Sequence, residues 1–182
     1  MQLDFMLKLK RELKLETKEE QMRVRIFTDG ACSENPGPGG WAVVFNTASK
    51  CHTFSGNEQL TTNNRMELKA VIEAFKRIVS KERQFFEPRH EYDIYSDSAY
   101  VVNTINNHWI EAWQKNNWQT TKREDVKNRD LWEQFSKLKT EANKLGISIT
   151  LNKIKGHSGN TFNELVDKLA KEESMKAKVA SQ

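Results

Sequence analysis

Three acidic residues occupy positions where strands or helices are expected to begin or end. Asp29 follows the apolar and β-branched run 24–28, Asp97 follows a second such run, and Glu67 lies early in an amphipathic helix. If the two strands are neighbours, Asp29 and Asp97 point into one crevice at the carboxyl ends of the strands, where ligands of open α/β sheets usually bind. Carboxylates held that close together repel one another unless a cation lies among them.

Such a cluster of oxygen ligands favours Mg²⁺ or Mn²⁺ over zinc. Two ions roughly 3.5–4 Å apart would stabilise both the attacking and the leaving oxygen of an in-line phosphoryl displacement. Considered singly, Asp29 is also typical of a turn, Asp97 of a helix cap, and Glu67 of a capping partner or a surface acid. The glycine-rich segment 30–40 strengthens the metal-site interpretation, although we expect its glycines to serve the turn into the next strand.

The elements that must position these acids alternate strand and helix, which predicts an α/β fold with parallel, crossover-connected strands. The expected strands cover residues 24–28, 41–46, 50–54, 89–95 and 147–154. The expected helices run from the capping residues 61–64 to about 79, from Ser98 to about 105, and over 128–145 and 162–175.

Composition limits the class of protein. With 182 residues, 37% hydrophobic and 30% charged, the chain fits one globular domain with an appendage. The net charge of +4 indicates a polyanionic partner only weakly. Cys32 and Cys51 are too few for a disulfide framework, and we expect them to be reduced. No apolar run approaches the roughly 20 residues that span a bilayer, and residues 1–11 lack the core of a secretory signal, so we expect a cytoplasmic protein without membrane contact.

Residues 1–22 form a charged, amphipathic N-terminal extension in which leucines and methionines alternate with lysine and glutamate. Three interpretations remain open for this segment. It is a solvated helix packed on the domain, a helix that binds a partner or a second copy, or a flexible tail.

Four sequence blocks, in order along the chain, resemble ribonuclease HI (ribonuclease H type 1). They cover residues 28–40, 62–68, 95–98 and 155–159, and the likeness extends over about 22–175. The resemblance implies a ribonuclease H-like fold, with a five-stranded mixed sheet in the order 3-2-1-4-5 flanked by helices. It implies a catalytic domain over 23–175, with a basic handle at about 107–125 and a polar tail over 176–182. The implied protein is a monomer.

The implied activity is endonucleolytic hydrolysis of the RNA strand of RNA/DNA hybrids, leaving 5′-phosphate and 3′-hydroxyl ends. Mg²⁺ is the implied cofactor, with two ions when substrate is bound and Mn²⁺ as a substitute. The metal-binding carboxylates carried over by motif are Asp29, Glu67, Asp97 and Asp167. Pattern alone assigns Asp167 to an ordinary helix surface. The fifth catalytic residue, His157, would assist proton transfer or product departure, although a solitary histidine is more often structural.

The resemblance also implies how substrate is read. The matching contacts to the RNA strand are the Cys32 backbone, Asn35, Asn63, Asn64 and Ser98. Thr62 and Asn128 match residues that hold a phosphate of the DNA strand, and Tyr100 and Trp109 match residues that pack beside its sugars. Two departures predict modest affinity. Leu60 stands where the family often has arginine, and the handle carries asparagine, glutamine and acids among its cations.

Two further classes compete with this interpretation. One is a non-catalytic module that binds hybrids on the same fold, and retention of the four acids and the histidine argues against it. The other comprises the ribonuclease H domain of a reverse transcriptase and a transposase or integrase. The segment 63–67 and the handle favour a grip on hybrids over strand transfer.

Overall fold

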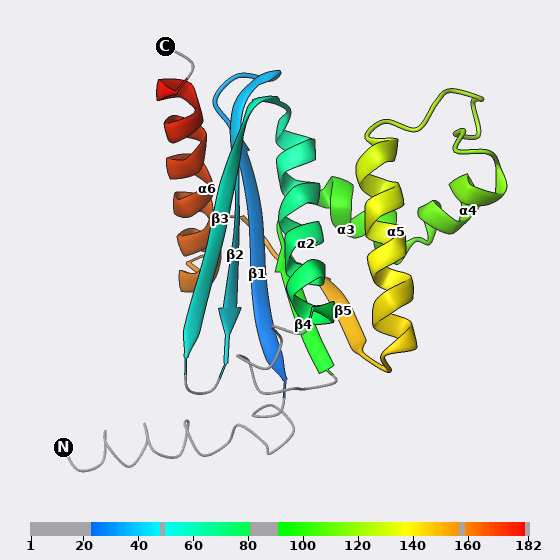
Figure 1. The fold of residues 1–182 in the computed structure, drawn as a ribbon, viewed down its shortest axis with the longest axis horizontal. Helices are drawn as coiled ribbons and strands as arrows, with labels where there is room; N and C mark the ends of the chain where they lie inside the picture. Colours follow the sequence, from blue (N-terminus) through cyan, green and yellow to red (C-terminus); the bar gives the residue numbers. More distant parts are fainter. Residues whose placement is uncertain (1–22, 48–49, 81–90, 157–158, 181–182) are drawn as a thin grey trace.

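A computed structural model describes residues 23–47, 50–80, 91–156 and 159–180. A single five-stranded sheet with the strand order β3-β2-β1-β4-β5 forms its centre (Figure 1), as predicted. The strands are β1 (Val24–Cys32), β2 (Gly37–Asn46), β3 (Cys51–Thr61), β4 (Glu91–Ser96) and β5 (Ser148–Lys153). β1, β2 and β3 pair antiparallel, whereas β4 lies parallel to both β1 and β5.

Helices cover both faces of the sheet. They are α2 (Asn63–Val79), α3 (Ala99–Asn106), α4 (Trp109–Lys115), α5 (Arg129–Lys144) and α6 (Thr161–Val179). α2 packs on β1 and β2 and is backed by α5, while α6 packs alone on β1, β2 and β3 (Figure 1). The predicted caps are present, because the side chains of Thr62 and Ser98 accept hydrogen bonds from Arg65 N and Val101 N.

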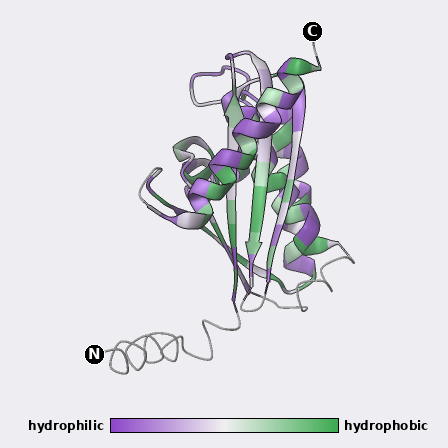
Figure 2. Ribbon diagram, turned by 90° about the vertical axis from the view of Figure 1, so that its left-hand side faces the viewer, coloured by the Kyte–Doolittle hydropathy of each residue, from purple (hydrophilic) through white to green (hydrophobic). Residues whose placement is uncertain are grey.

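Each face of the sheet has its own apolar core, because side chains alternate along a strand. Ile26 of β1 belongs to the larger core beneath α2 and α5, and the next residue, Phe27, belongs to the smaller core beneath α6. Trp132 and Phe135 of α5 are fully buried in the larger core. In Figure 2 a strand at the centre of the sheet is largely green, whereas the helices also carry much purple.

Asp29 lies within β1 and not at its end, which corrects the sequence expectation. β1 continues to Cys32 because the second half of β1 stays paired with β2, as far as the pair Cys32 and Gly39. The parallel pairing with β4, in contrast, stops at Phe27. The carboxylate therefore lies where one neighbouring strand has ended and the other continues, and this leaves the edge beside Asp29 open.

The glycines after Asn35 do not form the turn that we expected, because Gly37, Gly39 and Gly40 belong to β2. A Cβ atom at Gly40 would lie well inside 3.0 Å of the Ala170 carbonyl oxygen of α6. These residues lack side chains because neighbouring elements approach the strand closely.

Besides β1 and β2, two further elements are longer than predicted. β3 continues to Thr61 and not to 54, because pairing with β2 holds a run of glycine, asparagine and glutamate that has low intrinsic β propensity. α6 continues to Val179 through residues expected in the polar tail, and Ala177 there is buried. Residues 1–22 lie outside the described part of the chain, so their three interpretations stay open. Within the described residues, no helix combines the length and the apolar character needed to cross a bilayer.

Candidate active site

One open cleft brings together acids from four separate parts of the fold. They are Asp29 of β1, Glu67 of α2, Asp97 after β4 and Asp167 of α6. Gly30 permits this convergence, because a Cβ atom there would collide with the backbone of Met66 and Glu67. The first turns of α2 therefore lie directly against β1 beside Asp29.

The Asp29 carboxyl is the most buried of the four, and its residue is 7% exposed. Its Oδ1 accepts a hydrogen bond from Gly30 N at 2.7 Å. Burial, followed by the negative charge of Asp97, raises the pKa of Asp29 to about 8. Without a cation, this carboxyl therefore holds a proton at neutral pH.

Glu67 is fixed by two hydrogen-bond donors. Ser98 Oγ donates to its Oε2, and Asn63 Nδ2 donates to its Oε1 at 2.8 Å. Burial nevertheless raises the pKa of Glu67, because the two donors and the nearby charge of Lys153 only partly offset it. A carboxylate held on both oxygens has little freedom to turn away from a ligand.

Asp97 and Asp167 each have a lysine beside them. Lys153 Nζ donates to the main-chain oxygen of Asp97 at 2.6 Å, and Lys171 Nζ donates to Asp167 Oδ2 at 2.7 Å. The chain also passes close to Asp97 at Gly156, where a Cβ atom would lie 2.7 Å from Asp97 Oδ2. His157 itself lies outside the described residues, so its catalytic role stays a prediction.

The donor set fits a hard divalent cation that also takes ligands from substrate. All four side chains offer only carboxylate oxygens, which Mg²⁺ and Mn²⁺ prefer. Among residues 23–47, 50–80, 91–156 and 159–180, no three acidic, histidine or cysteine side chains form a ready-made cage for an ion. Mg²⁺ usually binds through one or two carboxylates, with water and substrate phosphate completing the shell.

The predicted contacts to the RNA strand fall into two groups. Cys32 and Asn63 line the cleft with the acids. Asn35 and Ser98 stand behind them, because Asn35 Oδ1 accepts from Asn63 N at 3.2 Å and Ser98 holds Glu67. Asn64 is exposed and does not line the cleft. Their contacts to RNA stay predictions.

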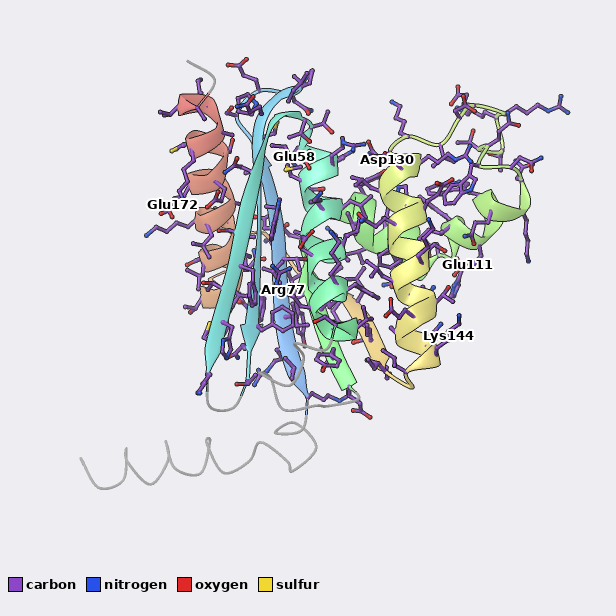
Figure 3. All side chains as sticks on the ribbon, in the orientation of Figure 1. Glu58, Arg77, Glu111, Asp130, Lys144 and Glu172 are labelled. Atoms are coloured by element: carbon purple, nitrogen blue, oxygen red, sulfur yellow. The ribbon has the colours of Figure 1, made fainter. Side chains whose placement is uncertain are left out.

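The two predicted phosphate contacts are joined by a residue to which sequence reasoning gave no role. The Arg65 backbone N–H donates to Thr62 Oγ1 at 3.4 Å, and its Nη1 lies 3.4 Å from Asn128 Oδ1. The same guanidinium makes a bidentate pair with Asp130, at 2.9 and 2.6 Å. Figure 3 shows Asp130 at the end of α5 that faces α2. Leu60 is 78% exposed, as expected for a residue that takes no part in this network.

Tyr100 serves the same network from α3. Its hydroxyl accepts hydrogen bonds from Asn128 Nδ2 at 3.0 Å and from Trp132 Nε1 at 2.8 Å. The Tyr100 ring packs edge-on against Trp132, with 5.6 Å between ring centroids. Its hydroxyl is therefore engaged within the protein, and its ring remains half-exposed.

The handle, residues 107–125, projects from the body of the protein beyond α5 (Figure 1). Trp109 is 45% exposed, whereas Trp113 and Trp118 pack against the larger core. Lys139 of α5 donates a hydrogen bond to Glu111 of α4 at 2.8 Å, and this contact holds the handle against α5. Glu111 is labelled in Figure 3.

Sequence reasoning also missed three residues of α6 that line the cleft. Lys171, Ser174 and Met175 follow Asp167 at four, seven and eight positions, so they share one face of the helix. That spacing was readable from the sequence once Asp167 was placed in the site. Lys171 puts a positive charge on the cleft wall.

Comparison with known proteins agrees with this fold. The family model described as RNase H matches residues 21–175. A Ribonuclease H of Caldicellulosiruptor saccharolyticus is 45% identical over 148 residues, which cover 81% of this chain and 93% of that protein. A Ribonuclease H of Chlorobium chlorochromatii is 46% identical over 151 residues, covering 82% and 94%.

Two solved structures share the fold. The crystal structure of LC9-RNase H1, a type 1 RNase H with the type 2 active-site motif, has a TM-score of 0.65 at 27% identity, covering 85% of this chain and 73% of that one. LC11-RNase H1 in complex with RNA/DNA hybrid has a TM-score of 0.60 at 24% identity, covering 85% and 98%. This chain therefore belongs to the ribonuclease H family.

Proposed function

We propose that this protein is an endonuclease that hydrolyses the RNA strand of RNA/DNA hybrids with two bound Mg²⁺ ions, leaving 5′-phosphate and 3′-hydroxyl ends. Mn²⁺ substitutes for Mg²⁺. The observation that carries the proposal is the convergence of Asp29, Glu67, Asp97 and Asp167, from four elements, on one open cleft. Family membership supports the same activity. Because all four acids come from one chain, a monomer suffices.

The acids would hold the cations at the scissile phosphate. When bound, the ions would lower the pKa of the attacking water and stabilise the negative charge on the attacking and leaving oxygens. Asp29 and Asp97 would contact both ions, Glu67 would hold one of them on the substrate side, and Asp167 would complete the other. The hydrogen bonds from Ser98 and Asn63 keep Glu67 oriented for this task. His157 would carry a proton during the reaction or help product to leave.

Substrate recognition follows from the position of polar groups beside the acids. Asn63 reaches both the cleft and Glu67, so a group that recognises the 2′-hydroxyl adjoins the metal site. The Cys32 backbone, Asn35, Asn64 and Ser98 complete the contacts to RNA. LC11-RNase H1, a structural neighbour, is in complex with an RNA/DNA hybrid.

The DNA strand would lie across the second network and the handle. Thr62 and Asn128 would hold one phosphate, and Tyr100 and Trp109 would pack beside the sugars. The exposed ring of Trp109 supports this assignment. We also propose a cytoplasmic location, which the two free cysteines support because reducing compartments keep thiols unpaired.

The test is a cleavage assay on a labelled RNA/DNA hybrid, double-stranded RNA and double-stranded DNA, each with Mg²⁺, Mn²⁺ or chelator. We expect cleavage of the hybrid alone, and only with metal. Asp97→Asn should lower the rate at least about a hundredfold, the usual effect of losing one group that stabilises transition-state charge.

Glu172→Gln is the matched control, because Glu172 points away from the sheet on the outer side of α6 (Figure 3). It should cleave at the wild-type rate. Hybrid cleavage by Asp97→Asn at the wild-type rate would refute the proposal. Tight hybrid binding by the wild-type protein without any cleavage would favour the non-catalytic binding module.

A further inference from the structure

Lys171 occupies an unusual place for a lysine on an exposed helix. It lines the same cleft as the four acids, and its ammonium lies 2.7 Å from Asp167 Oδ2. A second pair of the same spacing on α6, Lys168 with Glu172, lies 3.9 Å apart. Figure 3 shows Glu172 on the side of α6 that faces away from the sheet. Only the first of these two pairs is part of the candidate active site.

The position of Lys171 follows from the charge of the cleft. Four carboxylates converge there, and in the absence of a divalent ion their repulsion must be relieved by protons or by nearby cations. Lys171 supplies one such cation directly to Asp167. Lys153 supplies another, but its ammonium donates to the main-chain oxygen of Asp97 and acts on the Glu67 carboxylate only through its charge.

A divalent ion that binds Asp167 through Oδ2 needs the oxygen that Lys171 now holds. The lysine can yield it, because the Lys171 side chain is 52% exposed and the Asp167 side chain 24% exposed. Exposed pairs of this kind contribute only about 0.2–1 kcal/mol. The ammonium sits on a flexible four-carbon stem, so it can swing into the open cleft without any change in the helix.

We propose that Lys171 is a positioning residue that acts as a built-in competitor of the divalent cation: it holds Asp167 in the metal-free protein and must leave it before the cation binds there. This inference rests on the proposed function, because it takes Asp167 to be a metal ligand. It goes further by giving a role to a residue that does not itself bind the metal.

Competition has a signature that a merely structural pair does not produce. Removing the lysine frees Asp167 and removes one positive charge from the cleft, so the apparent affinity for a divalent cation rises. A pair of about 0.2–1 kcal/mol corresponds to a gain of about 1.4- to 5-fold. A lysine that only supports the helix would leave cation affinity unchanged when removed, or weaken it through loss of order in α6.

The test is calorimetric titration of the full chain with Mn²⁺ at pH 7 and low salt, without nucleic acid. The proteins compared are the wild type, Lys171→Met, Lys171→Arg, Lys168→Met as the matched control, and Asp167→Asn. We expect Lys171→Met to bind Mn²⁺ about 1.4- to 5-fold more tightly than Lys168→Met does. Lys171→Arg keeps the charge and should bind as the wild type does. Thermal unfolding in chelator should give a somewhat lower midpoint for Lys171→Met than for Lys168→Met, because Lys171 also offsets the repulsion among the acids of the cleft.

Equal or weaker binding by Lys171→Met than by Lys168→Met would overturn the competition while leaving the metal site intact. If the wild type bound no Mn²⁺, or if Asp167→Asn bound it as tightly as the wild type, then Asp167 would not be a metal ligand. That second result would overturn both this inference and the proposed metal site. The two failures are therefore distinguishable in one set of titrations.

Discussion

Replacement of Asp29 by asparagine should stabilise the metal-free protein, and the gain should grow with pH. The residue is 7% exposed, and burial together with the charge of Asp97 raises its pKa to about 8. An aspartate in an unfolded chain has a pKa of about 3.9. Between these values the folded protein holds a proton that the unfolded chain has lost. Stability therefore falls as pH rises from about 4 to about 8.

The size of the effect follows from the two pKa values. About four pH units at about 1.4 kcal/mol each give an upper limit of about 6 kcal/mol lost by pH 8. The actual loss of stability is smaller than this limit, because neighbouring acids take up protons when Asp29 ionises. We therefore expect Asp29→Asn to be about 3–6 kcal/mol more stable than the wild type at pH 8. At pH 4.5 the two should agree to within about 1 kcal/mol, because an asparagine oxygen can still accept the Gly30 N–H.

The assay is urea unfolding in chelator at pH 4.5, 6 and 8, with Glu172→Gln as the control that follows the wild type. Glu67 also has a raised pKa, but it contributes to both proteins and cancels in the comparison. Added Mg²⁺ should stabilise the wild type at pH 8 far more than Asp29→Asn, because only the wild type keeps the full set of ligands. An advantage for Asp29→Asn that is equal at pH 4.5 and pH 8 would refute this account of the buried carboxyl.

Two other substitutions test how the site is assembled. Gly30→Ala should lower the free energy of unfolding by about 1–3 kcal/mol and lower cleavage further still, because the added methyl pushes α2 and Glu67 away from β1. Gly146→Ala is the control: its Cβ atom meets nothing within 4 Å, but the φ of +66° strains the backbone there, so it should lower stability and leave cleavage by the folded protein unchanged. Equal cleavage by the two variants would contradict the packing explanation. Asp130→Asn should lower the free energy of unfolding by about 1 kcal/mol and weaken hybrid binding in a filter or anisotropy assay, because it loses the bidentate pair that fixes the second network. Its control is Glu133→Gln, which breaks an exposed pair worth about 0.3–0.5 kcal/mol, and an equal effect on hybrid binding would show that the network is not needed.

The sequence predicts the order of elements well because apolar periodicity and capping residues are local signals. The helix that begins after Thr62 and ends at Val79, and the cap at Ser98, are found as expected. Strand lengths were less predictable. β3 is extended by hydrogen bonds to β2, and those bonds depend on a partner and not on the residues of β3 itself.

The site was predictable only in part. Asp29, Glu67 and Asp97 stand near element ends that the sequence marks, whereas Asp167 lies inside a helix whose polar face looks like any other. Its place in the cleft depends on how α6 packs on the sheet, and Gly40 in β2 permits the close approach of that helix. Arg65 was overlooked for a similar reason, because its partner lies 65 residues away.

Gly30, Gly156 and the buried Asp29 all result from the close packing of backbone around the acids of the cleft. Gly30 and Gly156 let backbone approach Asp29 and Asp97 more closely than any side chain would allow, so the acids share one cleft. That arrangement is unfavourable in the metal-free protein, where a proton on Asp29 and an ammonium on Asp167 offset the repulsion. A divalent cation would replace both, and its binding would then stabilise the folded protein. The acids therefore destabilise the metal-free protein for the same reason that they would bind metal, so substitutions that stabilise it at this site should impair its function.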